Sequence, residues 1–124
     1  RTILDIAEAM QLRRVRVMGA NRIELSGFTD TMRERKRLMD ERADAFITLP
    51  GGIGTLEELF ETWTAGYLGM HAKPVVLLDP FDFYAPFLRW LQDLQGQGFV
   101  AQRSMDRLSI TDSVADALRL ATGR

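Results

Sequence analysis

The fold of this chain is decided by the stretch Ala45-Phe46-Ile47-Thr48-Leu49-Pro50-Gly51-Gly52-Ile53-Gly54-Thr55-Leu56-Glu57-Glu58. Its first five residues are almost continuously apolar, which is typical of a strand buried on both faces of a parallel sheet. Pro50 ends that strand, and a glycine-rich turn follows. Beyond the turn, apolar side chains recur at helical spacing, at Leu56, Leu59, Phe60, Trp63 and Tyr67. The stretch therefore predicts a strand, a glycine turn and a helix.

The glycine turn favours an anion. Gly51, Gly52 and Gly54 remove side chains where backbone amides turn together, and the following helix adds the positive end of its dipole. Ligands of open α/β sheets bind beyond the carboxyl ends of the strands, where this turn lies, so we expect a phosphate group here. The spacing is neither G-x-G-x-x-G nor that of a P-loop, which disfavours ATP hydrolysis. Alternatively, the glycines only connect, and Thr55 and Glu58 form a capping box.

Length, charge and composition narrow the class of protein. A chain of 124 residues is predicted to form one nucleotide-binding α/β domain, 1–124. The net charge of −1 gives no general attraction to nucleic acid, and the absence of cysteine excludes disulfides and thiolate chemistry. His71 has no partner at ligand spacing, so we expect a loop or helix-end histidine and neither metal nor cofactor. No signal peptide or long apolar run occurs, which predicts a cytoplasmic protein without a membrane partner.

The remaining elements also follow from periodicity and capping residues. Helices are predicted at 3–12, at 31–43, from the capping Asp82 through Pro86 to about residue 95, and at 113–121 after the capping Asp112. Strands are predicted at 15–18, 23–28, 75–78 and, at a sheet edge, 108–110. This alternation predicts a parallel α/β sheet with flanking helices, although the strand order cannot be read from the sequence.

The helix expected at 31–43 carries two cations in an unusual place. Met32, Met39 and Ala43 define its apolar side, and Arg35 and Lys36 fall between them rather than opposite. A structural explanation is that both side chains extend past the methionines into water or pair with a carboxylate. A functional explanation is that they wait for an anionic ligand.

Two stretches together, Met32-Arg33-Glu34-Arg35-Lys36 and Pro50 to Glu58, resemble the LONELY GUY family of cytokinin riboside 5′-monophosphate phosphoribohydrolases. The resemblance covers residues 29–121 and continues through Gly69-Met70-His71-Ala72-Lys73-Pro74, whereas residues 1–28 match poorly. It implies a Rossmann-like parallel sheet with flanking helices, here without the family's recognisable first strand-helix units. It also implies a homodimer.

The resemblance further implies a reaction, namely hydrolysis of the N-glycosidic bond of N6-modified adenosine 5′-monophosphates to free base and ribose 5-phosphate. The family's catalytic pair falls on Arg35 and Glu58, and its substrate-binding positions fall on Met32, Lys36, Gly51, Gly52, Gly54 and Thr55. A carboxylate suits this reaction because the sugar becomes oxocarbenium-like as the base leaves. We expect Glu58 in the first helical turn, where the amide ends favour its ionised form.

Such proteins are often labelled lysine decarboxylases, but the sequence gives that label little support, because Lys36 and Lys73 are the only lysines and neither suits a pyridoxal phosphate Schiff base. Two other readings stay open at this point. A non-catalytic carrier of a nucleotide or of the molybdenum cofactor would share the glycine turn. A shortened family member could act as a nucleotide-binding module. The pairing of Arg35 with Glu58 favours the enzyme.

Overall fold

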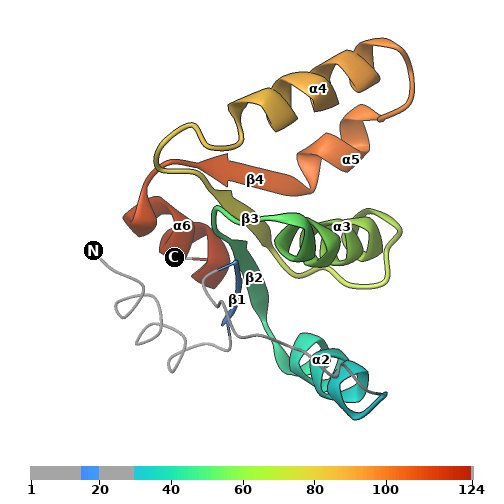
Figure 1. Ribbon diagram of the computed structural model, residues 1–124, viewed down its shortest axis with the longest axis vertical. Helices are drawn as coiled ribbons and strands as arrows, with labels where there is room; N and C mark the ends of the chain where they lie inside the picture. The colour runs from blue at the N-terminus through green and yellow to red at the C-terminus, as the bar shows by residue number, and fades with distance from the viewer. Residues whose placement is uncertain (1–14, 20–29, 124) are drawn as a thin grey trace.

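The computed structural model of the chain describes residues 15–19 and 30–123, except for the side chains of residues 30–33, 35 and 36. The described residues form a parallel sheet with helices on both faces (Figure 1). The strands are β1 (Val15–Met18), β2 (Ala45–Thr48), β3 (Val75–Leu78) and β4 (Leu108–Thr111). The helices are α2 (Asp30–Arg42), α3 (Ile53–Tyr67), α4 (Ala85–Gly96), α5 (Gln102–Asp106) and α6 (Val114–Thr122).

The sheet order is β1-β2-β3-β4, and all neighbours run parallel. Parallel neighbours need a crossover connection, and helices provide each of them here. The register places Arg16 opposite Phe46, and Val75 opposite both Phe46 and Leu108. The predicted parallel α/β class is confirmed, and β4 lies at an edge of the described sheet as expected.

The core has two layers, one on each face of the sheet. Phe46 and Leu77 pack with Leu59 and Trp63 of α3 on one face. On the other face, Ile47 of β2 and Val76 of β3 pack with Ala117 of α6 (Figure 1). Every residue of β2 and β3 is buried, which confirms the prediction of strands covered on both faces.

The capping-box alternative for Thr55 and Glu58 is wrong. Helix α3 begins at Ile53 with Gly52 as its N-cap, so Thr55 already lies inside the helix. The Thr55 side chain turns back onto the loop, and a Cβ atom added to Gly51 would lie 2.2 Å from Thr55 Oγ1. Glu58 consequently lies in the second turn of α3, beyond the first-turn position that we expected.

Other helix starts also differ from the predictions. Asp79, rather than Asp82, accepts hydrogen bonds from the Phe83 and Tyr84 amides ahead of α4, because Asp82 has a positive φ of 54° and is exposed. Ser113, rather than Asp112, caps α6 by accepting from the Asp116 amide. Helix α5 was not predicted. Pro86 lies in the first turn of α4 as expected, whereas the elements predicted at 3–12 and 23–28 lie outside the described residues.

The apolar face expected for α2 is only partly buried. Ala43 is buried, but Met39 is 53% exposed. The expectation that this face packs against the core is therefore wrong at Met39.

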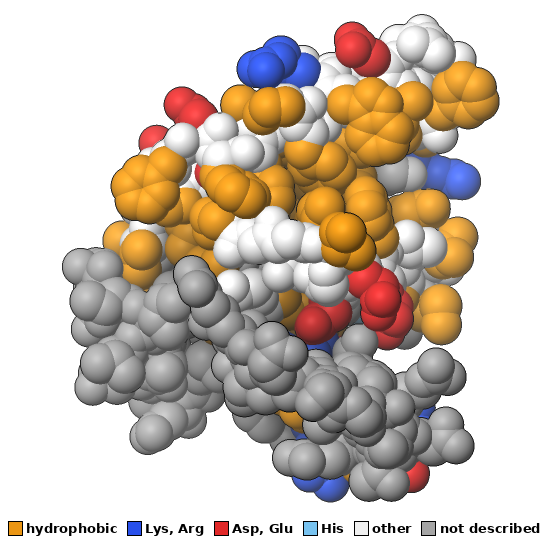
Figure 2. All heavy atoms as spheres, viewed as in Figure 1, with side chains coloured by type: hydrophobic (Ala, Val, Ile, Leu, Met, Phe, Trp, Pro, Cys, Tyr) orange, Lys and Arg blue, Asp and Glu red, His pale blue; other side chains and the backbone are white. Residues whose placement is uncertain are grey.

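The aromatic residues of α4 and of the segment just before it are divided between core and surface. Tyr84 and Leu91 are buried, and Phe87 packs against them, which confirms the predicted inward side. Phe83 and Trp90 are exposed by 52% and 53%, and Figure 2 shows hydrophobic side chains gathered on this part of the surface.

Within the described residues, no helix combines the length and the apolar character that a membrane crossing requires.

Candidate active site

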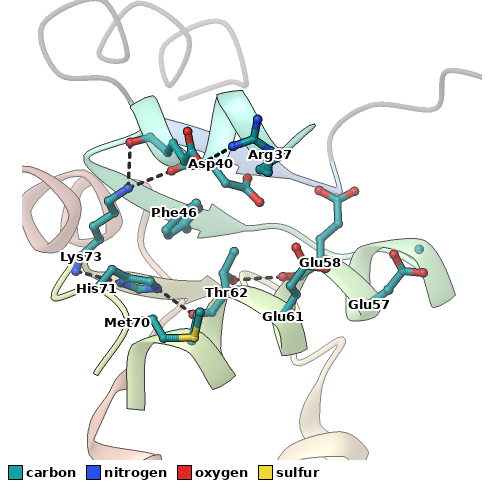
Figure 3. A pocket seen from close by; sticks show the side chains of 13 residues that line it. Arg37, Asp40, Phe46, Glu57, Glu58, Glu61, Thr62, Met70, His71 and Lys73 are labelled. Carbon is teal, nitrogen blue, oxygen red and sulfur yellow. Dashed lines mark hydrogen bonds and ion pairs between the residues drawn. The ribbon is translucent and has the colours of Figure 1, made fainter. Parts of the chain in front are cut away.

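A cleft of about 830 Å³ lies between α2 and α3, with Phe46 of β2 at its floor (Figure 3). Its wall on α3 runs from Gly54 to Ala65. The opposite wall is the C-terminal half of α2, and the segment leading into β3 closes one end. The described lining residues are Arg37, Asp40, Glu41, Phe46, Gly54, Glu57, Glu58, Glu61, Thr62, Ala65, Met70, His71 and Lys73.

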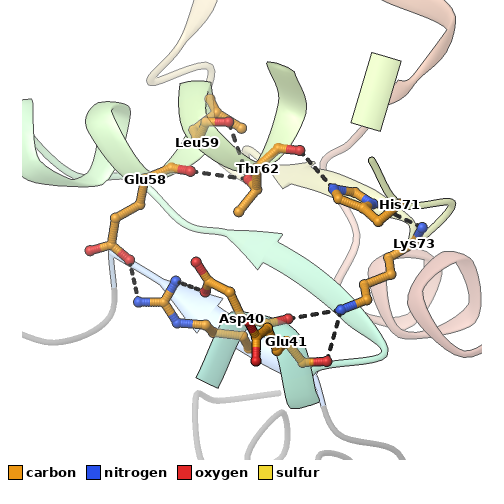
Figure 4. A network of polar contacts seen from close by, with 8 residues as sticks. Asp40, Glu41, Glu58, Leu59, Thr62, His71 and Lys73 are labelled. Atoms are coloured by element: carbon orange, nitrogen blue, oxygen red, sulfur yellow. Dashed lines mark hydrogen bonds and ion pairs between the residues drawn. The ribbon is translucent and has the colours of Figure 1, made fainter. Parts of the chain in front are cut away.

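A largely buried guanidinium joins the two long walls of this cleft. Arg16 Nη2 of β1 lies 2.6 Å from Glu58 Oε2 of α3, and Arg16 Nη1 forms an ion pair with Asp40 of α2. The Arg16 side chain is 10% exposed, against 20% for Asp40 and 24% for Glu58. Figure 4 shows Asp40 and Glu58 reaching toward each other from the two helices. Charge-assisted bonds of this kind hold the Glu58 carboxylate in one orientation.

Sequence reasoning identified Glu58 but missed Arg16 and Asp40. Arg16 is 24 residues from Asp40 and 42 from Glu58 along the chain. No local motif marks such contacts, because they depend on the order of strands in the sheet. The available signal was a lone arginine in the otherwise apolar strand Val15-Arg16-Val17-Met18.

The glycine turn contains both packed and open positions. Gly51 is packed against Thr55. Gly19, which directly follows β1, approaches the same side chain, because a Cβ added to it would lie 3.0 Å from Thr55 Cγ2. A Cβ at Gly52 or Gly54 would meet no atom within 4 Å. The first amides of α3 have no acceptor within the helix. This open end of α3 can therefore accept an anion, and Gly54 places it beside the cleft.

The described lining of the cleft carries more acidic than basic side chains. It contains five acidic residues, Asp40, Glu41, Glu57, Glu58 and Glu61, against the basic residues Arg37 and Lys73. Arg37 pairs with Glu41 at 2.6 Å. The acidic walls disfavour a phosphate, so the glycine end is the better anion site.

His71 has both ring nitrogens engaged. Its Nδ1 accepts from the Lys73 amide at 3.0 Å, so Nε2 carries the proton and donates to the Thr62 carbonyl at 2.9 Å (Figure 4). The prediction of a loop histidine is confirmed. Among the described residues, no group of three or more potential metal ligands occurs.

The Lys73 side chain caps the C-terminus of α2. Its Nζ donates to the Asp40 carbonyl at 2.8 Å and the Glu41 carbonyl at 3.1 Å. These carbonyls belong to the last turn of the helix, where acceptors lack partners within the helix. This contact gives Lys73 a capping role rather than that of a free amine.

The structure brings part of the predicted site together. Glu58 and Gly54 line the cleft, Gly51 and Gly52 directly precede α3, and Thr55 lies in its first turn. The predicted Met32, Arg35 and Lys36 lie in α2, the helix that provides the opposite wall, but their side chains lie outside the described part of the chain.

Comparison with known proteins identifies the family of this chain. A profile of the family described as "possible lysine decarboxylase" matches residues 4–121. This chain belongs to that family. Proteins named cytokinin riboside 5′-monophosphate phosphoribohydrolase from Mycobacterium tuberculosis and Mycobacterium marinum are 54% and 52% identical to it over 91 residues. Each alignment covers 73% of this chain and 49% of the relative.

A plant member of the family is similarly close over a shorter region. The protein named cytokinin riboside 5′-monophosphate phosphoribohydrolase LOG from Oryza sativa subsp. japonica is 54% identical over 71 residues, covering 57% of this chain and 29% of the relative. The resemblance to the LONELY GUY family is thereby confirmed. The chain spans about half the length of the bacterial relatives that it matches.

Proposed function

We propose that this chain carries the chemistry in its relatives' names and hydrolyses the N-glycosidic bond of N6-modified adenosine 5′-monophosphates. The observation that carries the proposal is the Glu58 carboxylate, fixed on the cleft wall by Arg16 and lying in the helix that begins at the glycine turn. A carboxylate held beside an anion site matches a substrate that has a phosphate at one end and the reacting carbon further along.

The geometry of α3 sets the spacing between these groups. Glu58 follows the first helical residue, Ile53, by five positions, or about 7.5 Å along the axis. A nucleotide with its 5′-phosphate on the Gly52 and Gly54 amides would place its ribose over Glu58. Its base would then extend along the cleft toward Ala65 and Met70, where apolar side chains suit an N6-substituent.

In the proposed reaction, the bond between C1′ and the base nitrogen breaks, and its electron pair leaves with the base. The Glu58 carboxylate stabilises the oxocarbenium-like sugar and orients the water whose oxygen bonds to C1′. The products are ribose 5-phosphate and the free base, which takes up a proton at its nitrogen.

The family resemblance supplies the remaining roles. Arg35 is the proposed second catalytic residue, binding the anionic part of the substrate or orienting its sugar, with Lys36 and Met32 beside the nucleotide. Gly51 and Thr55 shape the phosphate turn. A cytoplasmic homodimer that needs no cofactor, metal or nucleic acid is also part of the proposal. The exposed Phe83 and Trp90 provide apolar surface that a second copy could cover.

Product analysis tests the function. The protein is incubated with isopentenyladenosine monophosphate and with AMP, and free base and ribose 5-phosphate are quantified by chromatography. We expect both products from the N6-modified nucleotide in equal amounts, and product formation lowered by about a hundredfold or more with Glu58→Gln. Tight binding of either nucleotide without cleavage would instead identify a carrier and contradict the proposed reaction.

A further inference from the structure

Arg16 touches the candidate site without entering it. It contacts Asp40 and Glu58, which both line the cleft, but Arg16 itself is not among the described lining residues. The register of β1 with β2 places Arg16 opposite Phe46, and Phe46 packs on the α3 side of the sheet. The guanidinium thus lies on the α3 side of the sheet, between the two helices whose carboxylates it binds.

This position gives Arg16 control over the Glu58 carboxylate. A glutamate side chain is flexible, and the carboxylates of Asp40 and Glu58 repel each other across the cleft. A guanidinium is planar and always charged, so it can hold two carboxylates in fixed directions, which an ammonium does less well. Asp40 fixes Arg16 on one side, and Arg16 then fixes Glu58 on the other.

Stability alone does not account for this cluster. Arg16 is 10% exposed, and removing a charge from water opposes much of the gain from pairing, so a buried ion pair is weak evidence for stability. The three residues come from β1, α2 and α3, and the group they orient is the proposed catalytic carboxylate.

We propose that Arg16 is a positioning residue, anchored by Asp40, that aims the Glu58 carboxylate at the reacting carbon. The inference rests on the proposed function. It assigns Arg16 an effect on the chemical step and little effect on substrate binding, because Arg16 does not line the cleft.

The test measures kcat, KM and thermal melting for four variants with isopentenyladenosine monophosphate. Arg16→Met should lower kcat by about tenfold to a hundredfold, the size of effect caused by misplacing a catalytic group by about 1 Å, with KM nearly unchanged. Arg16→Lys should give a kcat between those of Arg16→Met and the wild type. Asp40→Asn should lower kcat less than Arg16→Met does.

Arg119→Met is the matched control, because Arg119 pairs with Asp116 at 2.7 Å on the exposed surface of α6. It should leave both constants unchanged. Rates are expressed per folded molecule, from the melting curves.

The outcomes separate this inference from the proposed function. An inactive wild-type protein contradicts the function itself, and the inference falls with it. An active wild type with normal kcat in Arg16→Met, or with a loss confined to KM, overturns only the positioning role. If Arg16→Met does not fold, the kcat of Arg16→Lys tests the proposal, since lysine keeps the charge but lacks the planar guanidinium. A wild-type kcat in that variant overturns the proposal, and a reduced kcat supports it.

Discussion

Tyr84 and Leu49, 35 residues apart, are joined by a 2.7 Å hydrogen bond from the Tyr84 hydroxyl to the Leu49 carbonyl. Leu49 directly precedes Pro50 and the glycine turn, so the bond ties the start of α4 to the loop that we assign to phosphate. Burial raises the pKa of Tyr84 above its ordinary value of about 10, and the nearby charge of Asp79 adds to that effect. The hydroxyl therefore keeps its proton in the folded protein at a pH where an exposed tyrosine loses it.

Tyr84→Phe should lower the free energy of unfolding at neutral pH by about 1 kcal/mol, because Leu49 loses its donor. The difference should shrink above about pH 10, where the unfolded chain releases the phenol proton before the folded one does. Wild-type stability therefore falls as pH rises toward the folded-state pKa. Urea unfolding of both proteins from pH 8 to pH 11 measures this, and a difference that stays constant over the range would contradict it.

Glu58→Gln should keep the fold but lower turnover by about a hundredfold or more, because it removes the charge that stabilises the transition state. Glutamine retains an oxygen that can accept from Arg16, so the melting midpoint should change little. Product formation and the melting midpoint are measured on the same preparation. Normal turnover would leave Glu58 as a partner of Arg16 with no part in the chemistry.

Gly52→Asp should weaken AMP binding without unfolding the protein. A Cβ atom added at this position meets no atom within 4 Å, so we expect the effect of aspartate to be electrostatic rather than steric. A carboxylate at the start of α3 repels phosphate from the helix amides. Gly52→Asn is the uncharged control in a titration with AMP. Equal affinity in the two variants would argue against phosphate at this turn.

Gly51→Ala and Gly54→Ala should have opposite effects on stability. At Gly51 the new Cβ would lie 2.2 Å from Thr55 Oγ1, and overpacking of this kind costs about 1–3 kcal/mol. At Gly54, inside α3, alanine meets no neighbour and should stabilise the helix by up to about 1 kcal/mol. Chemical denaturation compares the two, and equal midpoints would show that the turn is not packed as described.

Arg35→Met tests the residue assigned only by resemblance. We expect turnover to fall by about a hundredfold, as for other groups that stabilise developing charge. Arg35 lies four residues before the exposed Met39, on the same side of α2, so methionine should leave the melting midpoint unchanged or raised. A large fall in midpoint with full activity per folded molecule would assign Arg35 to an ion pair instead.

The sequence predicted the elements whose patterns are local. The continuous apolar runs of β2 and β3 reflect strands buried on both faces, and the helical spacing of apolar residues in α3 reflects a helix buried on one face. The caps were harder, since Asp79 and Asp82 are equally good capping residues and only the path of the loop selects Asp79. At the site, the motif identified Glu58, but its contact with Arg16 depends on β1 lying beside β2, which no local pattern encodes.

The anchor of the proposed catalytic carboxylate belongs to a strand at an edge of the described sheet. β1 is four residues long and, among the described strands, pairs with β2 alone. Short segments of this kind open locally at a lower free energy than the whole domain. If β1 detaches, Arg16 leaves with it and the Glu58 carboxylate loses its fixed direction while the core around β2 and β3 stays folded. Rising temperature or denaturant should then inactivate the protein before it unfolds, so that catalytic activity reports on the edge of the sheet rather than on its centre.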